Sequence, residues 1–226
     1  MSDPRRGPHP SAALRELVLA KTRAVPSPTA AEVAKKRARL AVAALVPAFV
    51  LLAALGVGPK GRPLALAVLV AVGWGAIATA TTALVFSARS PLGPSRPMMG
   101  WLAACAPLLA LSISAVGMAI YPDTWSGALP PKTHAACIIL GFAMGVAPLV
   151  AMMVHLRGID PVRPLARGAA LGATAGTWAG TGMMLLCPHH ELVHVLVGHV
   201  LPVALFAALG AVVGSKVLAL RPSAPR

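Results

Sequence analysis

Histidine and cysteine side chains that can bind a metal are concentrated in two short stretches of the chain. The first is His134-Ala-Ala-Cys137, and the second runs from Cys187 to His199. Imidazole and thiolate are good ligands for zinc and copper, so a set drawn from both stretches would be able to close a tetrahedral site. The candidate metal ligands are His134, Cys137, Cys187, His190, His194 and His199.

The two thiols, Cys137 and Cys187, have a second chemistry open to them. In an oxidising compartment they would form a disulfide that joins the two stretches covalently. Metal binding or disulfide formation would each act as a switch, and these residues alone do not decide between them. The alternative without chemistry is that they simply lie at a wet membrane interface.

One substring matches a catalytic motif. His190-Glu191-Leu-Val-His194 has the H-E-x-x-H pattern of zinc metalloproteases, in which the two histidines share a helix face and the glutamate acts as base. However, the motif starts in a predicted loop beside Pro188, and the aspartates beyond the N-terminal segment, Asp123 and Asp160, are also in predicted loops. An intramembrane zinc protease is therefore an alternative hypothesis, and we expect no catalytic activity.

The elements that position these residues are predicted from hydropathy. The chain is 57% apolar and only 12% charged, which is far from the roughly 25% charge of soluble domains. Each apolar stretch reaches the roughly 20 residues needed to cross a bilayer as a helix. The sequence thus predicts an all-α polytopic membrane protein with a six-transmembrane-helix bundle. The expected spans are 40–58, 64–87, 99–121, 134–156, 165–186 and 192–220.

The orientation follows from the basic residues between the spans. Seventeen Lys and Arg residues fall on the side that holds both termini, and three, Lys60, Arg62 and Lys132, fall on the other. The positive-inside rule places both termini in the cytoplasm, here of a bacterial inner membrane, and the Cys/His stretches outside. Because topology accounts for the net charge of +14, no direct nucleic-acid partner is expected.

The cytoplasmic segment 1–39 has the size of a small docking module. A predicted helix over 11–23 places Leu14, Leu17 and Val18 on one face, suited to an apolar groove on a soluble partner. The alternative is a basic topology anchor that lies on anionic lipid.

A second helix is predicted from Ala30 to Leu40. Thr29 begins it with a capping box, because Glu32 follows three residues later. It would lead into a transmembrane domain over 40–220, and residues 221–226 form a cytoplasmic tail.

Glycines recur every four residues in the fifth span, and small residues at this spacing let a neighbouring helix approach closely. They are Gly168, Gly172, Gly176 and Gly180. We expect them to pack helices within the bundle rather than to form a homodimer seam, and the oligomeric state stays open. No charged residue lies deep in a predicted span, which disfavours the further alternative of a small metal or solute transporter.

The six-span plan, the His134-Ala-Ala-Cys137 entry and the stretch from Cys187-Pro188 through Gly198-His199-Val-Leu-Pro-Val203 together resemble the NrsF-type membrane anti-sigma factors. The resemblance implies that the N-terminal segment holds an extracytoplasmic-function sigma factor and releases it on an envelope or oxidative signal. It assigns signal sensing to Cys137 and Cys187. The chain departs from the family at Gly198 and His199, where an aromatic pair is expected.

These observations lead to one hypothesis, that of an anti-sigma sensor without catalytic activity. Its partners are a sigma factor, bound through Leu14, Leu17 and Val18, and the lipid bilayer. It requires no cofactor, although zinc or copper would fit the extracytoplasmic Cys/His residues.

Overall fold

The structure is a computed structural model that describes residues 63–86, 95–121, 129–156 and 163–219, with scattered positions between 16 and 54. The chain divides into two compact units, Met1–Lys36 and Arg37–Arg226. All the helices described below belong to the second unit.

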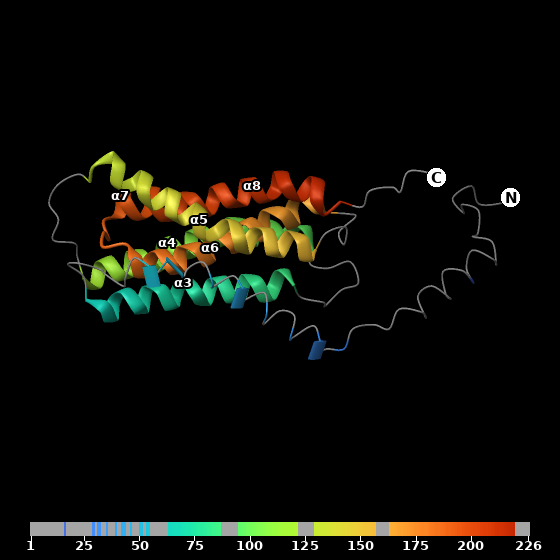
Figure 1. Ribbon diagram of the computed structural model, residues 1–226, viewed down its shortest axis with the longest axis horizontal. Helices are drawn as coiled ribbons and strands as arrows, with labels where there is room; N and C mark the ends of the chain where they lie inside the picture. Colours follow the sequence, from blue (N-terminus) through green and yellow to red (C-terminus); the bar gives the residue numbers. More distant parts are fainter. Residues whose placement is uncertain are drawn as a thin grey trace. The chain divides into compact units, whose positions relative to one another are not determined.

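Helices are the only regular secondary structure among the described residues, which contain no strand, and this confirms the predicted all-α class. Five long helical stretches begin and end within a few residues of five predicted spans (Figure 1). They are α3 (Leu64–Val85), α4 (Arg96–Ile120), α5 (Pro131–His155), α6 (Pro164–Leu186) and a composite last helix made of α7 (Leu192–Val195), the π-helical turn η1 (Leu196–Val200) and α8 (Leu201–Val217).

The outer surface of this bundle is apolar. Four of the long helices, α3, α4, α5 and Leu192–Val217, are long and apolar enough to cross a membrane. Large side chains such as Leu69, Leu108, Ile139 and Val212 are exposed, whereas Ser114, Thr174 and three histidines are buried. Apolar residues outside and small or polar residues inside indicate a membrane protein, because lipid cannot satisfy polar groups.

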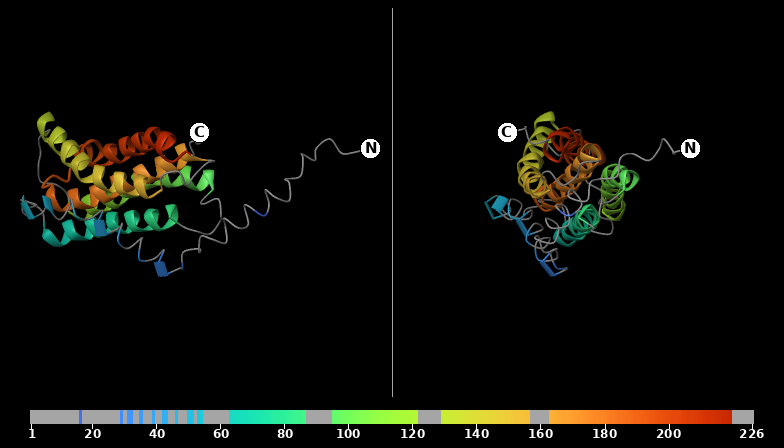
Figure 2. Two further views of the ribbon diagram at one scale, coloured as in Figure 1. Left: turned by 45° about the vertical axis from the view of Figure 1, so that its right-hand side comes forward. Right: turned by 90° about the vertical axis from the view of Figure 1, so that its right-hand side faces the viewer.

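The fifth predicted span, α6, is a helix of the expected length but is not among the four most apolar helices. It contacts α8, α3, α5 and α4, and the end-on view shows it between these helices (Figure 2). Most of its residues are buried by the other helices. Glycine and threonine therefore replace the large apolar residues that a lipid-facing helix needs.

Several predictions fall on residues outside the described part of the chain. These include the three apolar positions Leu14, Leu17 and Val18, and most of the first predicted span, 40–58. Within the first unit, the predicted capping box is confirmed. The Thr29 backbone N–H donates to Glu32 Oε2 at 2.7 Å, and the Glu32 N–H donates to Thr29 Oγ1 at 3.2 Å.

The predicted glycine packing within the bundle is also confirmed, between α6 and α8. A Cβ atom added to Gly168 would overlap the carbonyl oxygen of Gly210, and one added to Gly172 would overlap that of Phe206. Gly180 serves a different contact, because it makes room for the indole ring of Trp74. At Gly168 and Gly172, helices α6 and α8 therefore contact each other through their main chains.

We expect Gly172→Ala to destabilise the bundle. In an open helix this change gains up to about 1 kcal/mol of helix propensity. At Gly172 the added methyl instead meets the main chain of α8, which cannot rotate away, and overpacking of this kind costs about 1–3 kcal/mol. The measurement is the apparent Tm of the detergent-solubilised chain.

The matched control is Gly100→Ala in α4, because Gly100 is exposed and a Cβ atom there meets nothing within 4 Å. The control should match or exceed the unmodified chain in stability. Equal apparent Tm values for the two variants would contradict the assigned α6–α8 contact.

Candidate metal and redox site

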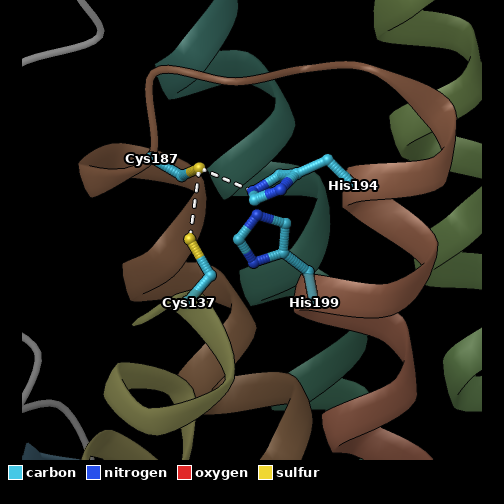
Figure 3. Close-up of side chains that lie close together, drawn as sticks. All are labelled: Cys137, Cys187, His194 and His199. Atoms are coloured by element: carbon cyan, nitrogen blue, oxygen red, sulfur yellow. Dashed lines mark hydrogen bonds between the residues drawn. The ribbon is translucent and has the colours of Figure 1, made fainter. Parts of the chain in front are cut away.

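Two cysteines and two histidines come together at the end of the bundle where α5 begins and α6 ends. They are Cys137, Cys187, His194 and His199, drawn in Figure 3. One ligand atom from each residue lies within 4.8 Å of those of the other three, and all four residues are buried. The structure therefore gathers four of the six predicted metal ligands into one cluster, called the Cys/His cluster below.

Three separate helix ends supply the Cys/His cluster. Cys137 is in the second turn of α5, and Cys187 is the C-cap of α6, where its N–H donates to the Met183 carbonyl at 2.8 Å. His194 and His199 come from α7 and η1 of the last helix. The site exists only when these three segments are packed together.

The π-helical turn η1 places the two histidines in the same cluster. On a regular α-helix, residues five apart point about 140° away from each other. In η1 the Leu201 N–H donates to the Leu196 carbonyl, five residues back, which adds a residue to the turn. The rings of His194 and His199 then lie edge to face, with centroids 5.1 Å apart.

Pro202 explains why the helix widens here, and Gly198 explains how closely it packs. Pro202 has no N–H, so the Gly198 carbonyl four residues earlier cannot receive its usual helical hydrogen bond. Gly198 also lets η1 approach its neighbours closely, because a Cβ atom there would lie 3.3 Å from Cys137 Cβ and 3.4 Å from the His194 ring. A larger residue at position 198 would push the last helix away from α5.

The sulfur atoms are close but not bonded. Cys137 Sγ lies 3.6 Å from Cys187 Sγ, well beyond the roughly 2.05 Å of a disulfide, so the two cysteines are not joined. Around them is an apolar cluster that includes Met144, Ala179 and Met183. A modest rotation about the side-chain bonds would be needed to join the two sulfurs.

His194 connects the thiols to a third histidine. Its Nε2 lies 3.1 Å from Cys187 Sγ, and its Nδ1 lies 3.2 Å from Nδ1 of His134. His189 contacts the same ring edge-on, with centroids 5.4 Å apart. His134, predicted as a metal ligand, therefore lies behind His194 and would orient its ring.

His190 is outside the Cys/His cluster, although the sequence predicted it as a ligand. Its Nε2 lies against α4, 3.0 Å from the point that a Cβ atom added to Gly117 would occupy. The motif begins in a loop, as its position beside Pro188 predicted, because Glu191 is the N-cap and the helix begins only at Leu192. Residues 187–191, which include Pro188, lie outside the helices, so the H-E-x-x-H match lacks the helical geometry of a metalloprotease.

Comparison with known proteins identifies the family. The family model for NrsF, described as negative regulator of sigma F, matches residues 19–219. No curated protein and no solved structure matches the chain significantly. The matched range contains the five long helices and the whole Cys/His cluster. The resemblance seen in the sequence is therefore confirmed, and the chain belongs to the NrsF family of negative regulators of sigma F.

Proposed function

We propose that the protein is a membrane-bound anti-sigma factor, without enzymatic activity, that holds an extracytoplasmic-function sigma factor at the bacterial inner membrane. The observation that supports this function most directly is the family match over residues 19–219. The four apolar helices supply the membrane anchor. The segment 1–39, with Leu14, Leu17 and Val18, supplies the sigma-binding surface, which hides the region that contacts RNA polymerase.

In this proposal the chain crosses the membrane six times and both termini are cytoplasmic. The residues 40–58 form the first span, and α6 counts as a span because its neighbours shield it from lipid. Seventeen basic residues on the side of the termini against three on the other side favour this orientation. The start of α5 and the end of α6 then face the extracytoplasmic side, together with the Cys/His cluster.

The Cys/His cluster is the sensor in this proposal, and it responds to a metal or to an oxidant. A two-electron oxidant would join the Cys137 and Cys187 sulfurs as a disulfide, with loss of the two thiol protons. Either event changes the contact between α5, the end of α6 and the last helix. It shifts the protein between two bundle arrangements only if it stabilises one of them more than the other.

We expect the detergent-solubilised protein to co-purify with one of the host's extracytoplasmic-function sigma factors, and deletion of residues 1–30 to abolish this. Replacement of Leu14, Leu17 and Val18 by Ala should weaken sigma binding about 100-fold or more. Truncating three aliphatic side chains that the sigma factor would bury costs at least about 3 kcal/mol. The matched control replaces Arg15, Glu16 and Lys21, on the polar face, with Ser. Absence of any sigma factor from the purified complex would refute the proposed function.

We expect the double variant Cys137→Ser, Cys187→Ser to bind the sigma factor normally and to fail to release it when the inducer is added. Serine keeps the size of the side chain but neither forms a disulfide nor binds soft metals. Release is measured as sigma-dependent reporter expression. Cys105→Ser is the matched control, because Cys105 lies in α4 outside the Cys/His cluster, and it should release normally. Normal release in the double variant would remove both thiols from the sensing step.

The rival protease function makes a different prediction for Glu191. Because Glu191 is a helix N-cap and His190 lies against α4, we expect Glu191→Gln to leave sigma binding and release unchanged within about twofold. The measurement pairs the reporter assay with electrophoresis of co-expressed sigma factor and membrane proteins. A cleavage product that disappears in this variant would favour the protease.

A further inference from the structure

We propose that Cys137, Cys187, His194 and His199 form a closed zinc site that holds α5, α6 and the last helix together. The role of this zinc in sigma release rests on the proposed function, but its binding does not. The distances, the burial and the charge of these four residues all favour zinc.

The distances approach those of a tetrahedral zinc site. Zn–S bonds of about 2.3 Å and Zn–N bonds of about 2.0 Å place two sulfurs roughly 3.8 Å apart, and a sulfur and a nitrogen roughly 3.5 Å apart. The observed separations are 3.6 Å between the sulfurs and 3.1 Å between Cys187 Sγ and His194 Nε2. The largest separation within the set is 4.8 Å, so a small rotation of side chains completes the tetrahedron.

The burial of the set identifies the kind of site. Cys137 is 7% exposed, and Cys187, His194 and His199 are 3% exposed or less. Four protein ligands leave no coordination position for water or substrate, which is typical of structural zinc rather than catalytic zinc. The ion would therefore stabilise one arrangement of the three helix ends.

The charge of the set suits a buried position. Two thiolates balance the double positive charge of Zn²⁺, so the loaded site is neutral overall. Ions without such compensation are costly inside a membrane protein. Tetrahedral coordination by two sulfurs and two nitrogens also favours zinc over Cu²⁺, which prefers square-planar ligands.

His134 acts as a positioning residue for this site. Metal-binding histidines commonly use their second ring nitrogen to bind an outer partner, which fixes the orientation of the ring. His194 directs Nε2 toward Cys187, and its Nδ1 lies 3.2 Å from His134. His134→Gln keeps a hydrogen-bonding partner for His194, whereas His134→Ala removes it.

The full chain is purified in detergent from cells grown with zinc. The metal bound to it is then measured by inductively coupled plasma mass spectrometry. We expect about one zinc per chain. Reloading with Co²⁺ should produce thiolate-to-cobalt charge-transfer absorption and the visible bands of tetrahedral cobalt.

Cys187→Ser and His199→Ala should each bind the metal at least about 100-fold more weakly, whereas the control His190→Ala should retain the metal. His134→Ala should lose about 10–100-fold in affinity without loss of the tetrahedral bands, and His134→Gln should restore it.

If Cys187→Ser or His199→Ala fails to fold, His199→Cys tests the zinc ligands instead. A third thiolate should keep the metal and strengthen the charge-transfer band. Stoichiometric zinc with these losses supports the site. Less than about a tenth of a zinc per chain after loading, or a cobalt spectrum unchanged in Cys187→Ser, overturns it. Sigma binding is measured on the same samples. Zinc-free protein that binds sigma refutes only the zinc site, and zinc-loaded protein that binds no sigma refutes only the proposed function.

Discussion

The main-chain contact between α6 and α8 determines the position of everything around it. Gly168 and Gly172 on one helix, with Gly210 and Gly214 on the other, allow this approach because none of them carries a side chain. Close approach replaces the hydrophobic effect, which cannot drive helix association within lipid. It also sets the depth at which η1 meets the ends of α5 and α6. The Cys/His cluster depends on this register, because half of its residues belong to the last helix.

The residue types around α6 are distributed in the opposite way to those of a soluble protein. Valine and leucine cover the outside, while the interior around α6 holds glycine, alanine and threonine. Two tryptophan side chains in the interior donate hydrogen bonds to hydroxyl groups. The Trp74 indole N–H donates to Ser114 Oγ, and the Trp178 indole N–H donates to Thr82 Oγ1, each at 3.1 Å. These bonds link α3 to α4 and to α6, so polar contacts complement the packing of small residues.

Much of this organisation could be predicted from the sequence, because apolar length and turn residues determine where membrane helices begin and end. Five predicted spans match helices, and four of the six predicted ligands lie together. The failures have local causes. His190 was predicted as a ligand, but it precedes the helix, which starts only after Glu191, and it lies outside the Cys/His cluster. The place of His199 depends on a π-helical turn, whose only sequence signals are Gly198 and Pro202. His134 was predicted as a ligand, but its ring contacts the ring of His194 instead. The spacing of residues in the sequence does not reveal this contact.

The Cys/His cluster also constrains how the protein is made. Its residues come from α5, from the end of α6 and from the last helix, so synthesis of the chain produces Cys137 long before His199. During that interval Cys137 and Cys187 have neither histidine of the last helix beside them. The cluster is therefore assembled only after the final helix has been inserted and has docked on α6. A complete cluster thus marks a chain whose membrane insertion is finished.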